Sequence, residues 1–123
     1  MKMLINGKSV ETCSGEFFDI VNPATGELID RVPKGMENEA AMAIEAASSA
    51  FSGWASTSPQ QRAGILYRAA GIVRQRKDEL AFLLTREQGK PFSEAKNEIA
   101  GFANVLEYYC GLASSFHGDF VQI

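Results

Sequence analysis

The first 34 residues contain short apolar runs separated by turn residues. These runs lie in "MLINGKSV", "EFFDIVNP" and "GELIDRVP", between Gly, Asn, Asp, Pro and Thr. Such runs are typical of short strands. Asn6-Gly7 is a dipeptide that tolerates the positive φ angles of a tight hairpin turn, and Pro23 and Gly26 stand where a reverse turn needs them. The pattern predicts a small antiparallel β-unit over residues 1–34, with its strand pairing left open.

The hydrophobic period changes at Glu37. From there, apolar residues recur at spacings of three and four, which places them on one face of a helix: Ala40, Ala43, Ile44, Ala47, Ala50, Phe51 and Trp54. A second helix is predicted to begin at Pro59, because Ser58 can cap it and Gln61 can complete a capping box. The polar stretch "RQRKDE" then interrupts the apolar stripe, which predicts two helices or one bent helix between Pro59 and Gln88.

The stretch "REQGKP", residues 86–91, raises the choice between a phosphate-binding loop and a helix end. A Walker-type loop needs an earlier glycine and a Ser or Thr after the lysine, but here Pro91 follows Lys90. Gly89 comes directly after the last periodic residue, and a proline soon afterwards is the usual way to end one helix and begin another. The stretch therefore predicts a helix end.

The last predicted helix carries a heptad-like seam, formed by Ala95, Ile99, Phe102, Leu106, Tyr109, Ala113 and Phe116. A second stripe of Val105, Tyr108 and Leu112 widens its apolar face, which predicts neighbours on two sides. Gly118 is predicted to end this helix, and "DFVQI", residues 119–123, to start a strand. The predicted fold class is α+β and mostly α, with the β-unit of residues 1–34 followed by three to four amphipathic helices over residues 37–118.

Charge and composition exclude several classes of function. With 12 Lys and Arg against 15 Asp and Glu, the chain offers no basic face, so no nucleic-acid partner is expected. No apolar segment approaches the length of a membrane span, and the first residues contain no apolar run of signal-peptide length, which predicts a cytoplasmic protein without a membrane partner. Cys13 and Cys110 form no CxxC motif, and with one histidine they indicate neither a disulfide framework nor a zinc site.

Covalent catalysis requires a nucleophile beside a base. Cys13 is flanked by turn residues, and Cys110 lies next to the apolar face of a helix, so neither context indicates activation. His117 could act as a general base, or its cation could lie at the negative end of a helix dipole. We assign no catalytic or cofactor-binding residue from these positions.

Glu94 and Glu98 stand one helical turn apart, as a general acid and base could. Lys90 and Lys96 are interspersed with them, however, and such mixed charges are typical of a solvated face with weak ion pairs. The residues alone therefore predict a mostly helical domain without a complete catalytic constellation.

The order of the segments is more specific than any single one. "LINGKSV", "FDIVNPATGELIDRVPKG", "AFSGWAS", "SPQQRAGILYRAAGIV", "LLTREQGKPFSEAKNEI" and "EYYCGLASSFHGD" follow one another in register. Over all 123 residues this order resembles the N-terminal segment of the aldehyde dehydrogenase superfamily. The wording "EQGKP" is most similar to the succinate-semialdehyde and lactaldehyde branches.

The resemblance implies a longer parent enzyme that oxidises an aldehyde to a carboxylic acid with NAD or NADP. In the semialdehyde branch the substrate would be a semialdehyde. In that family the catalytic cysteine, the general-base glutamate and the cofactor-binding sheet lie beyond the position that matches Ile123. The resemblance therefore implies that this chain alone is inactive and binds no cofactor. Its implied partner is the remainder of the dehydrogenase subunit, or a second copy in a homo-oligomer.

Two peripheral sites are also implied by the resemblance. Phe102 matches a position that lines the substrate tunnel in relatives, with Val105 and Leu106 near it. The carbonyls of Ile20 and Val21, with Glu87, match a monovalent-cation site.

Two alternatives stay open. The chain could be a stand-alone helical interaction or oligomerisation module derived from such an enzyme. It could also be an enzyme in its own right that uses Glu94, Glu98 and His117.

Overall fold

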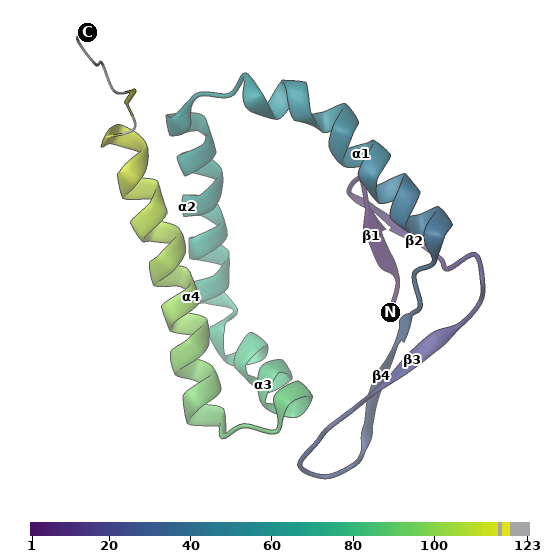
Figure 1. The fold of residues 1–123 in the computed structure, drawn as a ribbon. Helices are drawn as coiled ribbons and strands as arrows, with labels where there is room; N and C mark the ends of the chain where they lie inside the picture. Colours follow the sequence, from purple (N-terminus) through teal and green to yellow (C-terminus); the bar gives the residue numbers. More distant parts are fainter. Residues whose placement is uncertain (116, 119–123) are drawn as a thin grey trace, which may run out of the picture. The chain divides into compact units, whose positions relative to one another are not determined.

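A computed structural model describes residues 1–115 and 117–118 of the chain. Four strands are followed by four α-helices and a short 3₁₀ helix within this described part (Figure 1). The predicted α+β, mostly helical class is confirmed. The chain forms two compact units: residues 1–56 with 86–89, and residues 57–85 with those from 90 onward.

The first unit begins with a hairpin of β1 (Met3–Ile5) and β2 (Lys8–Val10), paired antiparallel with Ile5 opposite Lys8. Asn6 and Gly7 connect the strands with φ angles of 52° and 70°. Two consecutive positive φ angles are those of a type I′ turn, whose twist matches that of the strands. The hairpin predicted at Asn6-Gly7 is confirmed.

A second hairpin pairs β3 (Phe17–Val21) with β4 (Leu28–Pro33), from Phe17 opposite Pro33 to Val21 opposite Leu28. Its turn is closed by Asn22, whose side-chain oxygen accepts from the Ala24 amide at 2.9 Å and whose carbonyl accepts from the Gly26 amide at 2.7 Å. The reverse turn predicted here is confirmed, and each strand pairs with its neighbour in sequence.

Helix α1 (Glu37–Ala55) completes this unit and contacts β1. Figure 1 shows it lying beside the β1–β2 hairpin. Its small residues, such as Ala43 and Ala46, line hollows against the hairpin. Because alanines fill little of that space, the contact leaves much of α1 exposed.

The second unit begins at α2 (Pro59–Gln75), and the predicted capping box is confirmed at its start. The Gln61 amide donates to the Ser58 hydroxyl at 3.2 Å, and the Ser58 amide donates to the Gln61 side chain at 2.8 Å. Helix α3 (Lys77–Gln88) follows as a separate helix. The two-helix alternative for residues 59–88 is therefore the one the chain adopts.

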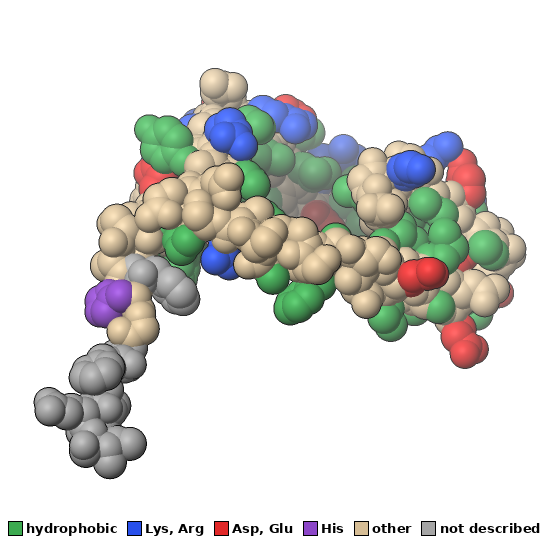
Figure 2. All heavy atoms as spheres, turned by 90° about the horizontal axis from the view of Figure 1, so that it is seen from above, with side chains coloured by type: hydrophobic (Ala, Val, Ile, Leu, Met, Phe, Trp, Pro, Cys, Tyr) green, Lys and Arg blue, Asp and Glu red, His purple; other side chains and the backbone are tan. Residues whose placement is uncertain are grey.

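Helix α4 (Phe92–Leu112) runs antiparallel to α2 and packs along it (Figure 1). Among the described residues, four hydrophobic side chains are fully buried, and all are alanines: Ala70, Ala81, Ala95 and Ala103. Small residues let helices approach closely, but they bury little apolar area. The larger apolar side chains of α4 therefore stay largely exposed, and Figure 2 shows hydrophobic side chains, in green, at the surface of the molecule.

The predicted end of the last helix at Gly118 is wrong, because α4 ends at Leu112 and gives way to the 3₁₀ turn η1 (Ala113–Ser115). The hydroxyls of Ser114 and Ser115 donate to the carbonyls of Gly111 and Leu112, at 3.0 and 3.1 Å. Such local bonds favour helix termination. Phe116 and the strand start expected at residues 119–123 lie outside the described residues.

Candidate functional site

The three residues implied to line a substrate tunnel share one region of α4. Phe102 and Val105 are 52% and 51% exposed, and Leu106 is half-buried beside them. Positions three and four apart on a helix are neighbours on its surface, so these side chains form one apolar patch. The patch continues towards Tyr109 and Leu112, which are also exposed.

A charged cluster on the α2–α4 pair holds α4 in register. Arg74 on α2 donates to both carboxylate oxygens of Glu107 on α4, at 3.0 and 2.6 Å, and to the side-chain oxygen of Asn104 at 2.8 Å. These hydrogen bonds lower the pKa of Glu107 and raise that of Arg74. Two-point contacts of this kind are geometrically specific, so the cluster limits sliding and rotation of α4 against α2.

A groove of about 420 Å³ opens where the start of α2 meets the end of α4. Its lining is mainly apolar, with Arg62 and Tyr109 as the polar side chains: Pro59, Arg62, Ala63, Leu66, Tyr109, Leu112 and Ala113. Apolar grooves with few polar groups bind hydrophobic ligands or side chains. The groove contains no nucleophile paired with a base.

The residues implied to hold a monovalent cation belong to the first unit. Ile20 and Val21 lie on β3, where the register shifts between them, and Glu87 is exposed in the segment 86–89. Such irregularities locally disrupt a strand ladder. Elsewhere too, the described residues contain no group of three His, Cys, Asp or Glu side chains that could hold a metal ion.

The backbone of Gly89 lies close to Pro23 and Ala24. It ends α3 with a φ of 71°, as predicted for the helix stop in "REQGKP". A Cβ atom at this position would lie 2.9 Å from Cγ of Pro23 and 3.3 Å from the Ala24 amide nitrogen. Both the positive φ and the close approach therefore require glycine.

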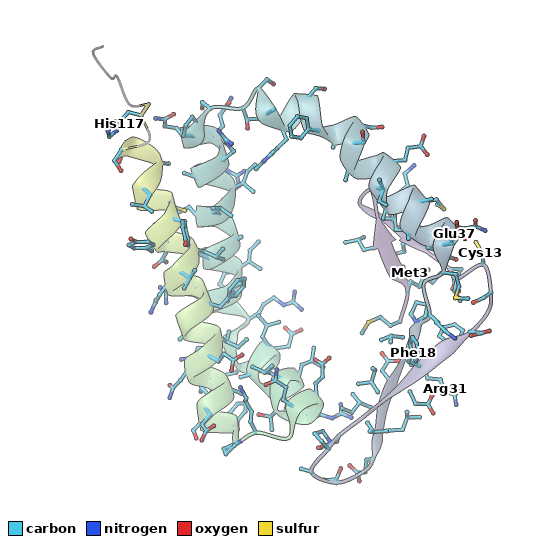
Figure 3. The ribbon with its side chains drawn as sticks, viewed as in Figure 1. Met3, Cys13, Phe18, Arg31, Glu37 and His117 are labelled. Atoms are coloured by element: carbon cyan, nitrogen blue, oxygen red, sulfur yellow. The ribbon has the colours of Figure 1, made fainter. Side chains whose placement is uncertain are left out.

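Glu39, at the start of α1, is the one fully buried charged residue among those described, at 2% exposure. Its carboxylate accepts from the Cys13 amide at 2.6 Å and from the Met36 amide at 2.9 Å. The Cys13 bond, followed by the Met36 bond, lowers the pKa of Glu39 from 4.5 to about 2. Figure 3 shows Cys13 beside the start of α1, near Glu37.

Neither cysteine is placed as a nucleophile. Cys13 is exposed, but the hydrogen bond and charge of Glu39 raise the pKa of its thiol. A raised pKa lowers the thiolate fraction, so Cys13 is a weaker nucleophile than an ordinary thiol. Cys110 is half-buried, and its thiol donates to the Ala63 carbonyl at 3.2 Å.

The acid–base candidates do not form a constellation. Glu98 pairs with Lys90, and Lys96 pairs with Asp78 at 2.8 Å, which favours the solvated-face interpretation. His117 lies beyond η1, with Nδ1 2.5 Å from the Ser115 carbonyl (Figure 3). The sequence predicts His117 near the C-terminal end of the last helix, but it lies beyond the helix.

The sequence reasoning missed Glu39, Arg74 and Glu107. For Glu39 a signal existed, because a glutamate three residues after a helix N-cap is half of a capping box. No local pattern links Arg74 to Glu107, which are 33 positions apart.

The described strands do not form a parallel sheet of the Rossmann type. A dinucleotide site of that type is built from parallel strands, each joined to a helix by a glycine-rich turn. The described strands instead form two antiparallel hairpins. None of the described helices is long and apolar enough to cross a membrane.

Several solved structures are similar to this chain in both sequence and fold. The chain is 39% identical to a succinate-semialdehyde dehydrogenase from Burkholderia pseudomallei, covering 99% of this chain and 25% of that one, with a TM-score of 0.93. An NADP-dependent enzyme from E. coli matches at 36% identity, with coverages of 98% and 25% and a TM-score of 0.93. An NAD-dependent aldehyde dehydrogenase from Sinorhizobium meliloti matches at 32%, with coverages of 96% and 24% and a TM-score of 0.91.

The chain spans about a quarter of the length of these three solved enzymes. The sequence model of the aldehyde dehydrogenase family matches residues 10–123. The chain belongs to the aldehyde dehydrogenase family.

Proposed function

We propose that this chain forms the N-terminal part of an NAD(P)-dependent aldehyde dehydrogenase, which oxidises an aldehyde to a carboxylic acid. The observation that carries the proposal is the family match over residues 10–123, together with TM-scores of 0.91 to 0.93 against a quarter of each solved enzyme. Its partner in this proposal is the remainder of the same subunit, and its location is the cytoplasm.

A semialdehyde is the proposed substrate class, and NAD or NADP the proposed cofactor of the whole enzyme. The 39% identity to a succinate-semialdehyde dehydrogenase supports the substrate class. Similarity to both an NADP-dependent and an NAD-dependent enzyme supports a nicotinamide cofactor. When bound, that cofactor would accept hydride from the substrate. The isolated chain is proposed to bind no cofactor and to be inactive, which the two antiparallel hairpins of the described residues support.

The proposed contribution of this chain to the site is an apolar wall. Phe102, Val105 and Leu106 would face the carbon skeleton of the aldehyde and exclude water from it. Their joint exposure on α4 supports this role, because an exposed apolar patch generally marks a binding or packing surface. The Arg74–Glu107 contact would act as a positioning element that fixes the rotation of α4.

The proposed cation site is formed by the carbonyls of Ile20 and Val21 with the Glu87 carboxylate. Its support is that β3 and residues 86–89 belong to one compact unit, in which Gly89 is packed against Pro23 and Ala24. A bound monovalent cation would neutralise Glu87 and tie the two segments together.

A chimera tests the proposed function. Residues 1–123 would replace the matching quarter of the Burkholderia pseudomallei succinate-semialdehyde dehydrogenase, and oxidation of succinate semialdehyde would be followed with NAD and with NADP. We expect an active chimera and no activity from residues 1–123 alone. A chimera that folds and binds the cofactor but oxidises nothing would overturn the proposal.

A further inference from the structure

The groove between α2 and α4 contains a guanidinium that the described residues leave without a partner. Arg62 lines this groove of about 420 Å³ together with Tyr109 and apolar side chains. Its side chain is half-buried, and it makes no hydrogen bond or ion pair with any described residue. By contrast, Arg31, Arg74 and Arg76 each donate to a carboxylate of this chain. Arg62 is therefore a positive charge that still lacks a carboxylate.

The start of α2 fixes the position of Arg62. Ser58 caps this helix, and the Arg62 amide donates to the Ser58 carbonyl at 3.1 Å. The first turn of α2 carries no acidic side chain, so the positive end of the helix dipole adds to the charge of Arg62. None of the described residues that line the groove is acidic. Both charges therefore favour a carboxylate that comes from outside the lining.

A purely apolar partner would cover this groove only at a cost. Tyr109 and Leu112 in the lining are 57% and 43% exposed, so apolar side chains of a partner would gain by covering them. The same cover would remove the Arg62 guanidinium from water, which is unfavourable unless a carboxylate pairs with it. The partner that fits the groove therefore carries an Asp or Glu beside an apolar side chain.

The remainder of the same subunit meets this requirement most directly. The chain spans about a quarter of the solved enzymes that it matches, so three quarters of a subunit of that length lie outside residues 1–123. The 3₁₀ turn η1 contacts both α2 and α4 and contributes Ala113 to the groove, so the polypeptide passes along the edge of the groove. A segment of the same polypeptide has a higher effective concentration at the groove than a separate molecule has.

We propose that a segment of the remaining subunit covers this groove, pairing an Asp or Glu carboxylate with Arg62 and placing an apolar side chain against Leu66 and Leu112. The pairing rests on the function proposed above, because only a longer subunit contains such a segment. The planar guanidinium of Arg62 suits a two-point contact with a carboxylate. Such a contact fixes the direction in which the covering segment crosses α2.

Carbodiimide cross-linking of the full-length subunit, the longer polypeptide that contains residues 1–123, tests the pairing. Arg62→Lys keeps the charge and places an amine in the groove, which a carbodiimide joins to a carboxylate in direct contact. We expect peptide mass spectrometry to find this amine joined to an Asp or Glu beyond residue 123. Gln60→Lys is the matched control, because positions two apart on a helix do not share a face. It should give no link to that carboxylate.

The source of the carboxylate is read from the size of the linked product. The peptides are taken from the single-subunit band of a denaturing gel. A link to a second copy, or to a separate protein, is found in heavier bands instead. We expect the link at position 62 in the single-subunit band.

Thermal unfolding of the full-length subunit measures the contribution of the pair. Arg62→Met keeps an apolar stem of similar length but leaves the carboxylate buried and unpaired, so we expect the midpoint to fall by at least about 5 °C. Arg68→Met removes the same charge from an exposed position on α2 and should change the midpoint by about 1 °C or less. Circular dichroism shows whether each variant keeps its helices.

The proposal is wrong if the linked carboxylate lies within residues 1–123, is found only in heavier bands, or does not exist. It is also wrong if Arg62→Met and Arg68→Met lower the midpoint equally. The chimera reports on the proposed activity separately, because neither the link nor the thermal midpoint requires oxidation of an aldehyde. An active chimera without the link would leave the proposed function standing and overturn the pairing alone.

Discussion

Arg74 on α2 donates two hydrogen bonds to the carboxylate of Glu107 on α4, from Nε to Oε1 at 3.0 Å and from Nη2 to Oε2 at 2.6 Å. The same guanidinium reaches Asn104 at 2.8 Å. The core between these helices is made of alanines, which fix the distance between the helices better than their rotation. The polar contact therefore supplies the specificity that the apolar core lacks.

Replacing Arg74 by Lys keeps the charge but removes the two-point contact. We expect the thermal midpoint to fall by about 1–5 °C, because both side chains are partly exposed and such pairs contribute modestly. Arg76→Lys is the matched control, since Arg76 pairs with Glu79 three positions along the chain. Equal midpoints for the two variants in low salt would show that the Arg74 contact does not hold the helices.

The low pKa of Glu39 predicts a specific loss of stability in acid. A carboxyl whose pKa falls from 4.5 to about 2 on folding stabilises the fold above pH 4.5. This contribution is lost as the pH falls from about 4.5 towards 2. Urea unfolding followed by the fluorescence of Trp54, the single tryptophan, measures it across that range.

Glu39→Gln is the comparison for this titration, because it cannot ionise and cannot satisfy both amides equally well. We expect the variant to unfold at a lower urea concentration than the wild type at pH 7, with the difference between the two shrinking as the pH approaches 2. Other carboxylates with a lowered pKa, such as Glu107, contribute equally to both proteins and cancel in the difference. A difference that stays constant across this range would contradict the assignment.

Gly89 cannot be replaced without strain. Gly89→Ala puts a side chain at a φ of 71° and its Cβ 2.9 Å from Pro23, so we expect a loss of about 1–3 kcal/mol in unfolding free energy. Gly101→Ala within α4 meets no atom within 4 Å and should instead stabilise by about 0.5–1 kcal/mol. Denaturant titration of both variants measures these two changes in unfolding free energy. Equal changes for Gly89→Ala and Gly101→Ala would show that the close contact at Gly89 does not restrict the side chain.

The proposed tunnel wall is tested in the chimeric enzyme. Phe102→Ala removes the aromatic ring from the patch and should raise KM for the semialdehyde several-fold, while kcat changes less. Phe92→Ala, at the start of the same helix and 41% exposed, is the matched control and should leave KM unchanged. If both variants behave alike, Phe102 does not contact the substrate.

Local features of the fold could be predicted because their causes are local. Asn6-Gly7 dictates its own turn, Ser58 and Gln61 cap α2 within one helical turn, and Gly89 stops α3 through its own φ angle. The end of α4 was misplaced at Gly118 because apolar spacing continued past Leu112, while the bonds made by Ser114 and Ser115 ended the helix.

The contacts that fix each unit could not be predicted in the same way. Glu39 binds the amide of Cys13, 26 positions away, and the sequence around either residue gives no sign of the other. The tunnel and cation residues came from family resemblance. Phe102 on its own is as typical of a packing face as of a substrate wall, and only a measurement on an active enzyme separates the two.

We propose that this sequence is part of an aldehyde dehydrogenase subunit and that its native polypeptide is longer than residues 1–123. The most direct measurement is the mass of the polypeptide in its native source, by blotting with an antibody raised against residues 1–123. Because the chain spans 25% of the solved succinate-semialdehyde dehydrogenase, we expect a band about four times heavier than 13.4 kDa. A band near 13.4 kDa would contradict the proposal.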